Sequence, residues 1–304
     1  MTRNPLKTAL CGREMESPVM LGSGTIGERK ETVISALDSG AGAAVIRTLR
    51  VDNTKRRPFQ RPYYIEPNYM LNSDNNNATN WRDWVGHVGE IEKHGRLVVS
   101  ISARNPEDGK IIAGAMEKSA PSFYELNFSC SHSAKLYGRI SYDDAAKSLS
   151  GIRDATKTPV FLKLSLDNID VGRLAELEAS GLVDAYVLSN TIGPGLKIDI
   201  MTRRPALDSV LGGISGPAIK PLVMAGISGL MGNTGKPVIG VGGIESASDV
   251  LEYLILGCHA VQVYTAAHRR GLGVFKEINS GIEEFIMKSG ESLEEMRGSF
   301  KAGA

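Results

Sequence analysis

Three observations predict a (β/α)8 barrel. Short β-branched runs alternate with helical patterns almost from end to end of the 304 residues, which is typical of parallel βα units. Eight such units over about this length match the barrel fold. No break in composition and no linker divides the chain into halves, which favours a closed barrel over an open doubly wound sheet. We therefore expect one barrel domain over residues 1–304.

The eight expected strands are short runs rich in β-branched and other apolar residues. In chain order they are Val19–Ser23, Ala43–Leu49, Leu97–Ala103, Phe123–Ser129, Pro159–Ser165, Ala185–Thr191, Pro237–Gly242 and Ala260–Thr265. Helical patterns lie between and after them, at Glu31–Ser39, Pro106–Lys118, Tyr142–Thr156, Val171–Ser180, Gly216–Leu230, Ser246–Leu256 and Gly273–Met287.

Two insertions follow strands. The polar segment Arg50–Arg82, which contains "RRPFQRPYYIEPNYMLNSDNNNATNW", is too long for an ordinary βα connection, and loops of this length are usually functional or disordered. Its aromatic residues favour an ordered active-site loop. The second insertion is Gly193–Gly213.

Composition narrows the class of function. The balance of 35 Lys+Arg against 34 Asp+Glu offers no basic field for nucleic acid, so a small-molecule partner is expected. No signal-peptide core and no membrane span is present, so we expect a cytoplasmic protein that does not enter a membrane. The three cysteines, Cys11, Cys130 and Cys258, are widely spaced, which argues against disulfides, zinc or an iron–sulfur cluster held by this chain alone.

Polar side chains and glycines stand at almost every expected strand end. They are Gly22–Thr25, Arg47 and Thr48, Ser100 and Ser102, Asn127 and Cys130, Lys163 and Ser165, Asn190 and Thr191, Gly242 and Gly243, and Tyr264 and Thr265. In such barrels the reacting groups come from the carboxyl ends of the strands. This convergence predicts an active site at one rim.

The last two units predict a phosphate site. Gly242 and Gly243 follow the seventh strand, and Tyr264 and Thr265 follow the eighth, where barrels bind phosphate through backbone N–H groups and a short helix. The alternative is that the two glycines only make a tight turn.

Lys163 lies inside the apolar run "PVFLKLS", where an ammonium needs an anionic partner. The N1/O2 edge of a reduced flavin would be such a partner. The alternatives are an ion pair with a carboxylate at the rim, and a Schiff-base lysine in an aldolase or isomerase of phosphorylated metabolites.

In "ELNFSCSH", Asn127 can orient an amide edge of a substrate and the thiolate of Cys130 can remove a carbon-bound proton. A single cysteine is otherwise most often an inert core residue. His132 either tunes the thiol or binds substrate; the alternative is that it is plain surface.

Other chemistry finds little support. There is no HExxH motif, no GxSxG elbow, and no ligand spacing among the five histidines, so neither a metal nor a serine hydrolase triad is expected. A non-catalytic barrel that serves as a binding scaffold stays open. Yellow colour of the purified protein separates a flavoenzyme from the aldolase and the scaffold.

Several blocks together resemble the dihydroorotate dehydrogenase family, especially its soluble class. They are "ELNFSC", "VFLKLS", "SNTIG" followed by "IDIMTRRPAL", "GGISGPAIKPL", "PVIGVGGI" with "SASDVLEYLILG", and "AVQVYTA". The similarity covers nearly the whole chain and implies an FMN-containing barrel. Soluble members use a cysteine base where the membrane-bound class uses serine, so Cys130 implies the soluble class.

The resemblance also assigns residues by position. It implies FMN contacts for Ser23, Gly24, Thr48, Ser100, Asn127, Lys163, Gly216, Gly242, Gly243, Tyr264 and Thr265, and substrate contacts for Arg47, Asn72, Asn127, His132, Asn190 and Thr191. By the same analogy Cys130 takes a proton from C5 of dihydroorotate while hydride passes from C6 to the flavin. Reoxidation then uses an iron–sulfur flavoprotein subunit that passes electrons to NAD, or fumarate, or oxygen. A homodimer is expected.

Three substrate-facing positions depart from the family. Ser131 and His132 follow the cysteine where Pro and Asn are usual, Arg47 replaces a lysine, and "NSDNNNA" replaces Asn-x-x-Gly-Leu-x-Asn. An arginine is not equivalent to a lysine, because its planar guanidinium recognises carboxylates in pairs. The histidine resembles the Ser-Cys-Pro-His of dihydropyrimidine dehydrogenases. Dihydroorotate is therefore the first expectation, and another dihydropyrimidine or cyclic amide is the alternative.

Overall fold

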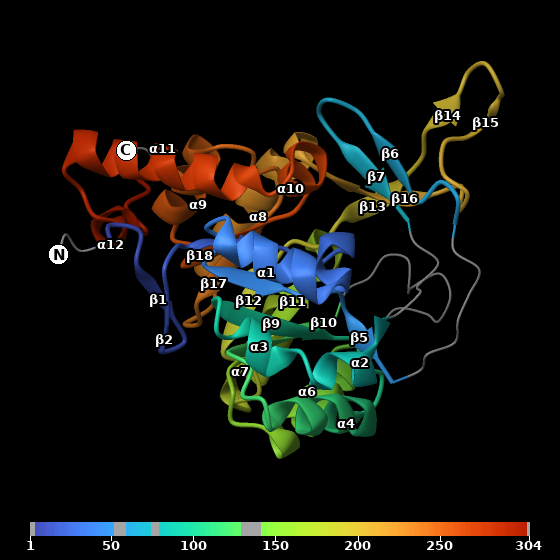
Figure 1. Cartoon of the computed structure of the whole chain (residues 1–304), viewed down its shortest axis with the longest axis vertical. Coiled ribbons are helices and arrows are strands. Elements are labelled where there is room, and N and C mark those ends of the chain that lie inside the picture. Colours follow the sequence, from blue (N-terminus) through green and yellow to red (C-terminus); the bar gives the residue numbers. More distant parts are fainter. Residues whose placement is uncertain (1–3, 52–58, 74–78, 129–140, 303–304) are drawn as a thin grey trace.

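The computed structural model describes residues 4–51, 59–73, 79–128 and 141–302. Eight parallel strands close into a barrel, in which β18 pairs with β3 and β9 pairs with β10 (Figure 1). They are β3 (Val19–Leu21), β4 (Ala43–Val45), β9 (Arg96–Ile101), β10 (Phe123–Asn127), β11 (Val160–Leu164), β12 (Ala185–Leu188), β17 (Val238–Val241) and β18 (Ala260–Val263). The expected (β/α)8 fold is confirmed.

The helices surround the barrel as expected. The long ones are α1 (Lys30–Asp38), α4 (Pro106–Glu117), α6 (Tyr142–Ala155), α7 (Val171–Ala179), α8 (Lys220–Met231), α9 (Ala247–Leu256) and α11 (Gly273–Ser289). Shorter turns are η1 (Thr25–Glu28), α2 (Trp81–Val85), α3 (Val88–Ile91), η2 (Leu166–Asn168), η3 (Pro217–Ile219), α10 (Thr265–Arg270) and α12 (Leu293–Met296). Both Ser141 and Ser246 start their helices, α6 and α9, with a capping box, which satisfies two N–H groups of each first turn.

The strands end earlier than the sequence predicts. The second expected strand continues to Leu49, whereas β4 ends at Val45, and the sixth continues to Thr191, whereas β12 ends at Leu188. Just beyond these ends the backbone N–H groups of Ile46, Ser189 and Asn190 still donate to Val98, Val241 and Leu164 of neighbouring strands. The polar side chains of Arg47, Thr48, Asn190 and Thr191 in these segments line a cavity at the rim. The sequence therefore predicts too long a strand at the segments whose side chains build the site. Leu49–Arg50 form a separate short strand, β5, which pairs with β8 (Thr79–Asn80).

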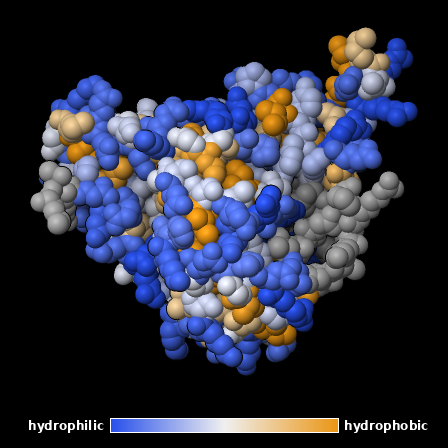
Figure 2. Space-filling model, viewed as in Figure 1, coloured by the Kyte–Doolittle hydropathy of each residue, from blue (hydrophilic) through white to orange (hydrophobic). Residues whose placement is uncertain are grey.

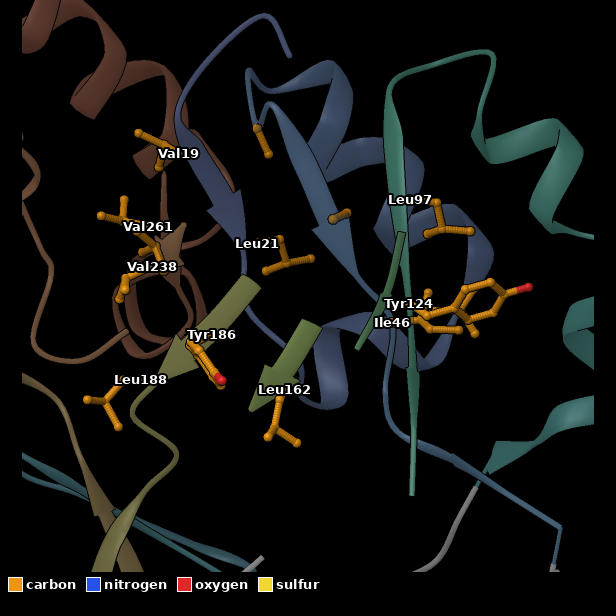
Figure 3. Close-up of a cluster of buried hydrophobic side chains, with 14 of the residues drawn as sticks. Val19, Leu21, Ile46, Leu97, Tyr124, Leu162, Tyr186, Leu188, Val238 and Val261 are labelled. Atoms are coloured by element: carbon orange, nitrogen blue, oxygen red, sulfur yellow. The ribbon is translucent and has the colours of Figure 1, made fainter. Parts of the chain in front are cut away.

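Alternation along the strands makes two apolar layers. Val98, Phe123 and Phe161 point into the barrel, whereas their neighbours Leu97 and Tyr124 pack outward against the helices (Figure 3); this is the period of two of a β-strand. The hairpin of β1 (Thr8–Leu10) and β2 (Arg13–Met15), which the sequence reading missed, adds two buried side chains to the interior layer. The barrel is therefore a packed core and not a pore.

The two insertions meet in one antiparallel sheet. Its strands are β6 (Tyr63–Ile65), β7 (Met70–Asn72), β13 (Ile192–Gly195) and β16 (Gly212–Ser215). Residues 59–73 of the expected active-site loop thus form a hairpin, and Asn72 of this hairpin pairs with Gly213. This sheet stands over one end of the barrel (Figure 1).

A second hairpin projects from the insertion sheet. It consists of β14 (Ile198–Asp199) and β15 (Arg204–Pro205), and Ile200 and Met201 at its tip are 84% and 87% exposed. The space-filling view shows hydrophobic atoms at this tip against a largely hydrophilic surface (Figure 2). Within the described ranges, no helix is both long and apolar enough to cross a membrane.

Candidate active site

A cavity opens at the carboxyl ends of the barrel strands, beneath the insertion sheet. Its lining comes from the ends of β3, β4, β10, β11, β12, β17 and β18 and from the insertions: Gly22, Ser23, Gly24, Thr25, Arg47, Thr48, Arg50, Tyr63, Met70, Asn72, Asn127, Lys163, Ser189, Asn190, Thr191, Ser215, Gly216, Ile219, Val241, Gly242, Gly243, Ile244, Glu245, Gln262, Val263, Tyr264 and Thr265. Seven of the eight strand ends that the sequence predicts to converge on one rim contribute to this lining. Ser100 and Ser102 of the third expected strand and Ser165 of the fifth are not part of it.

The structure brings nearly all the described site candidates together. Those that line the cavity are Ser23, Gly24, Arg47, Thr48, Asn72, Asn127, Lys163, Asn190, Thr191, Gly216, Gly242, Gly243, Tyr264 and Thr265. Ser100 does not line it, because its side chain is fully buried behind Thr48, with 3.0 Å between the two hydroxyl oxygens. Cys130, Ser131 and His132 lie outside the described residues, as do residues 74–77 of the substrate loop.

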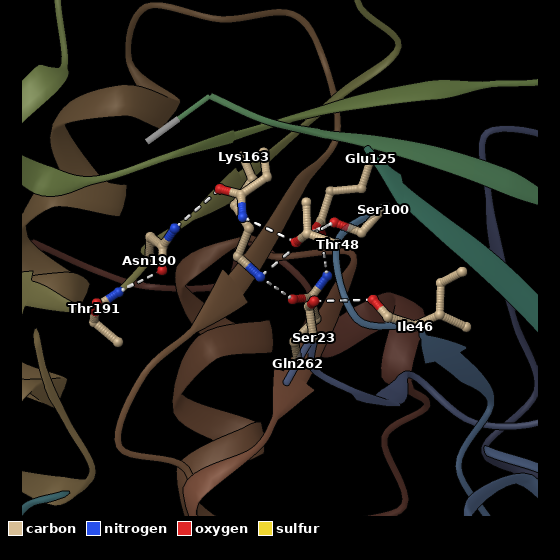
Figure 4. Close-up of polar contacts among 10 residues, drawn as sticks. Ser23, Ile46, Thr48, Ser100, Glu125, Lys163, Asn190, Thr191 and Gln262 are labelled. Atoms are coloured by element: carbon tan, nitrogen blue, oxygen red, sulfur yellow. Dashed lines mark hydrogen bonds and ion pairs between the residues drawn. The ribbon is translucent and has the colours of Figure 1, made fainter. Parts of the chain in front are cut away.

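A hydrogen-bonded row of two side-chain amides and a hydroxyl, Asn190, Asn127 and Thr48, lines the cavity; Asn190 and Thr48 are labelled in Figure 4. Asn190 Nδ2 donates to Asn127 Oδ1 at 3.1 Å, and Asn127 Nδ2 donates to Thr48 Oγ1 at 3.1 Å. The backbone N–H of Thr191 donates to Asn190 Oδ1 at 2.8 Å. The amide nitrogen of Asn127 carries two hydrogens, so a side chain that the row fixes in orientation can still donate to a ligand.

Asn72 reaches the cavity from the insertion sheet. Its Oδ1 is buried and has no hydrogen-bond partner among the described residues. A buried acceptor without a partner costs roughly 1–3 kcal/mol. A ligand that brings an N–H group to this oxygen would remove that cost.

The floor of the cavity carries a buried charge pair. Lys163 Nζ lies 2.9 Å from Gln262 Oε1 and 3.5 Å from Glu125 Oε1. Glu125 is fully buried and Lys163 is 5% exposed. The sequence left open whether Lys163 meets a carboxylate or faces a ligand, and the structure shows that it does the first while it lines the cavity.

Two glycines make an anion cradle at one end. Gly242 and Gly243 have φ values of 141° and 68°, a conformation that side chains disfavour. The N–H groups of Gly242, Gly243 and Ile244 have no acceptor within the described part of the chain. A Cβ on Gly243 would lie 2.6 Å from Lys220 Cβ and 3.1 Å from Gly216 O. Free N–H groups in such a turn bind anions, phosphate among them.

Hydrogen bonds among Thr25, Tyr63 and Tyr264 form another part of the cavity wall. Tyr264 Oη accepts from the Thr25 N–H at 3.0 Å and lies 2.8 Å from Thr25 Oγ1, to which Tyr63 Oη donates at 3.2 Å. The ring of His268 packs against both tyrosine rings, with centroids 4.9 Å from Tyr63 and 5.8 Å from Tyr264. Burial lowers the pKa of His268. The insertion hairpin is thereby fastened to α10.

Arg47, which stands at one of the three positions that depart from the resembled family, is paired. Its guanidinium forms an ion pair with Glu28, and only 13% of the Arg47 side chain is exposed. The charge that Arg47 brings to the cavity wall is therefore compensated by a carboxylate of the chain itself.

Comparison with known proteins decides the family. Residues 5–286 match the family model described as dihydroorotate dehydrogenase. The chain belongs to this family. Among its relatives is the protein of Thermococcus kodakarensis named dihydroorotate dehydrogenase B (NAD(+)), catalytic subunit, which is 33% identical over 303 residues that cover 98% of this chain and 99% of the relative. Proteins of the same name from Pyrococcus horikoshii and Methanocaldococcus jannaschii are 33% identical over 296 residues (96% of each chain) and 31% identical over 311 residues (96% of this chain and 97% of the relative).

The cavity fits the FMN that membership of the dihydroorotate dehydrogenase family implies. The cradle of Gly242 and Gly243 offers unpaired N–H groups to a phosphate, and Lys163 offers an ammonium to an electron-rich ring edge. Both features line the same cavity, and a molecule with a phosphate tail and a polar ring would use both. Gly243, Gly216 and Thr265 would hold the tail, and Lys163 and Asn127 would meet the ring.

Sequence reasoning missed Glu125, Gln262, Tyr63 and Arg50 as site residues. Two of them carried a usable signal. Glu125 stands two residues before Asn127 in β10 and so shares its face of the strand, and Gln262 lies in β18, two residues before Tyr264, which follows that strand. Arg50 and Tyr63 belong to the segment that was expected to be an active-site loop, but nothing in the sequence singled out either residue within it. Tyr63 enters the site through the long-range pairing of β7 with β16, which local patterns do not reveal.

Proposed function

We propose that this chain is the FMN-dependent catalytic chain of a dihydroorotate dehydrogenase, which oxidises the CH–CH bond of dihydroorotate to orotate in pyrimidine biosynthesis. The observation that carries the proposal is the set of amides that face one cavity with Lys163. The dihydroorotate ring has two N–H groups and two ring carbonyls. Asn72 Oδ1, which has no partner in the described part of the chain, suits a ring N–H, and the amide nitrogen of Asn127 suits a carbonyl.

The chain's own residues then divide the work. The amide row orients the ring, and the insertion sheet covers the cavity on one side; oriented binding of this kind lowers the barrier by avoiding reorganisation. FMN, when bound, supplies the hydride acceptor. Cys130, three residues beyond Asn127, is our candidate for the base that takes the proton from C5, and His132 for a neighbour that contacts substrate or tunes the thiol.

The names of the relatives suggest how the electrons leave. Each of the three relatives above is called a catalytic subunit with NAD(+) in its name. We propose that this chain also works with a separate subunit, an iron–sulfur flavoprotein that passes electrons to NAD, that it forms a homodimer, and that it acts in the cytoplasm.

A second candidate substrate is a cyclic amide without a carboxylate, as in the dihydropyrimidine dehydrogenase reaction. The pairing of Arg47 with Glu28 favours it. A guanidinium that is already neutralised by a carboxylate of the chain attracts a substrate carboxylate less than a free one does.

An anaerobic titration decides between the two substrates. The flavin-loaded protein is mixed with dihydroorotate in one cell and with dihydrouracil in another, and visible flavin absorbance is followed. Bleaching by dihydroorotate, with orotate formed in equal amount to the flavin reduced, supports the first proposal. A flavin that stays oxidised with dihydroorotate and bleaches with dihydrouracil supports the second.

A further inference from the structure

We infer that Glu125 is the built-in counter-charge of Lys163 and that its carboxylate limits how strongly the cavity favours reduced over oxidised FMN. The inference rests on the proposed function, since it concerns the same cavity and the same cofactor. Four residues are concerned: Ser100, Glu125, Lys163 and Gln262. They form a polar layer inside the barrel, and the family resemblance assigns a role to Ser100 and Lys163 but to neither Glu125 nor Gln262.

The layer draws side chains from four strands, of which β9, β10 and β11 are neighbours and β18 is not; hydrogen bonds and an ion pair join the four side chains inside the barrel. Ser100, Glu125, Lys163 and Gln262 come from β9, β10, β11 and β18, and each stands two residues beyond a buried apolar residue of the barrel interior, namely Val98, Phe123, Phe161 and Ala260. With a side-chain period of two, these four polar residues share the inward face with the apolar layer. Lys163 and Gln262 of this layer also line the cavity, and Figure 4 shows the polar contacts that join the layer.

Both oxygens of the Glu125 carboxylate are engaged within this layer. Ser100 Oγ donates to Oε1 at 3.3 Å and Gln262 Nε2 donates to Oε2 at 2.8 Å, while Lys163 Nζ lies 3.5 Å from Oε1. The side chain of Glu125 is 0% exposed, so water does not solvate its carboxylate, and the ammonium of Lys163 compensates its charge. The chain itself therefore satisfies this carboxylate, which does not depend on a ligand.

Gln262 links the two charges in a defined sense. Its Nε2 donates to Glu125, and its Oε1 accepts from Lys163 at 2.9 Å. A flipped amide would set its NH2 group against the ammonium and its oxygen against the carboxylate, so the two charges fix the orientation. Gln262 thus holds Lys163 at the cavity floor, where part of the hydrogen-bonding capacity of the ammonium is used by Gln262 and Glu125.

The sign of the effect follows from charge alone. Two-electron reduction makes the flavin ring more negative, so Lys163 stabilises the reduced form relative to the oxidised form. The charge of Glu125 acts in the opposite direction, and the low dielectric of the buried layer makes both effects strong. If Lys163 served only to attract an anion, it would do so more strongly without Glu125 beside it. A buried ion pair also seldom adds to the folding stability of a protein, so stability alone does not explain the presence of Glu125.

The test is the midpoint potential of bound FMN, measured anaerobically at neutral pH against a reference dye. In Glu125→Gln we expect the ratio of affinities for reduced and oxidised FMN to rise about tenfold or more, which is an upward shift of about 30 mV for a two-electron couple. Lys163→Met should shift the potential downward. The double variant should lie between the two single variants. A matched control is Glu92→Gln, which removes a carboxylate that binds Ser122 and Leu97 at the amino ends of β10 and β9; its potential should equal that of the wild type.

The outcomes separate the inference from the proposed function. A Glu125→Gln variant that binds FMN and has an unchanged or lower potential overturns the inference. If Glu125→Gln does not fold, the comparison of the double variant with Lys163→Met serves instead, and equal potentials in these two overturn it. A wild-type chain that binds no FMN overturns the proposed function together with the inference, whereas a flavin-loaded wild type leaves the proposed function standing whatever Glu125 does.

Discussion

Asn190, which follows β12, donates a hydrogen bond through Nδ2 to Oδ1 of Asn127 at the end of β10, over 3.1 Å. Asn127 in turn donates to Thr48, beyond the end of β4. These side chains come from three different βα units, so no local segment fixes their arrangement. The closed barrel brings them together, so the row is formed by the chain's own residues.

Replacing Asn190 by alanine removes the donor to Asn127 and one candidate contact to the substrate ring. A lost hydrogen bond to a buried polar group costs about 1–3 kcal/mol, so kcat/KM should fall about 5- to 150-fold. Steady-state kinetics of the wild type and of Asn190→Ala measure this fall in kcat/KM. Asn233→Ala, at an exposed asparagine whose side chain donates to Gly229 O, is the control and should keep full activity. Equal kinetics in both variants would remove the amide row from substrate recognition.

Gly24→Ala should weaken cofactor binding through Tyr264. A Cβ at residue 24 would lie 2.1 Å from Tyr264 Cε2, and the tyrosine ring cannot swing away freely because its hydroxyl bonds Thr25. We expect a loss of stability of about 1–3 kcal/mol, as for other overpacked sites, and a reduced FMN content. Urea unfolding and the flavin-to-protein ratio measure both. Gly86→Ala, where a Cβ meets nothing within 4 Å, should change neither, and similar losses in the two variants would contradict the argument.

Cys130→Ser should separate chemistry from binding. A general base contributes typically about 10²- to 10⁴-fold, so substrate-dependent bleaching should slow by that order while FMN stays bound. Stopped-flow absorbance of the anaerobic reaction measures the rate. Cys11→Ser is the control, because Cys11 lies in the turn between β1 and β2, against Asp184 O, and burial raises its pKa to about 12. Unchanged bleaching in Cys130→Ser would exclude the thiol as the base.

Stability should fall on mild acidification because of two histidines. Burial lowers the pKa of His268, and burial together with the charge of Arg297 lowers that of His259. The unfolded chain then binds more protons than the folded one, so the free energy of unfolding rises with pH below the ordinary value of about 6.5 and levels off above it. Each group adds at most about 1.4 kcal/mol per pH unit. Urea unfolding between about pH 5.5 and 7.5 tests this range; a His268→Asn variant with an undiminished slope would refute the contribution of that histidine.

The barrel itself was predictable from the sequence, because strand and helix periods are local. Runs such as 159–165 and helices such as α4 and α6 appear at nearly the expected residues. The rim was predictable for a related reason: parallel strands end at one edge, so Asn127, Lys163 and Tyr264 had to meet there.

The insertion sheet and the charge pair were not predictable in the same way. Asn72 and Gly213 pair although they belong to different insertions, and nothing in either segment signals the other. The partner of Lys163 was left open because a carboxylate and a ligand would leave the same sequence pattern. Only the register of β10 on β11 and the closure of the barrel through β17 and β18 put Glu125 and Gln262 beside it.

The measurement that tests the account most directly is the cofactor content of the purified chain. The protein is mixed with FMN, freed of unbound flavin by gel filtration, denatured, and the released flavin is quantified. We predict a yellow protein with one FMN per chain, and a large loss of bound FMN when Gly243 is replaced by valine, which would fill the anion cradle. A colourless protein, or flavin binding that ignores this substitution, would contradict the claim that the rim of the barrel holds FMN.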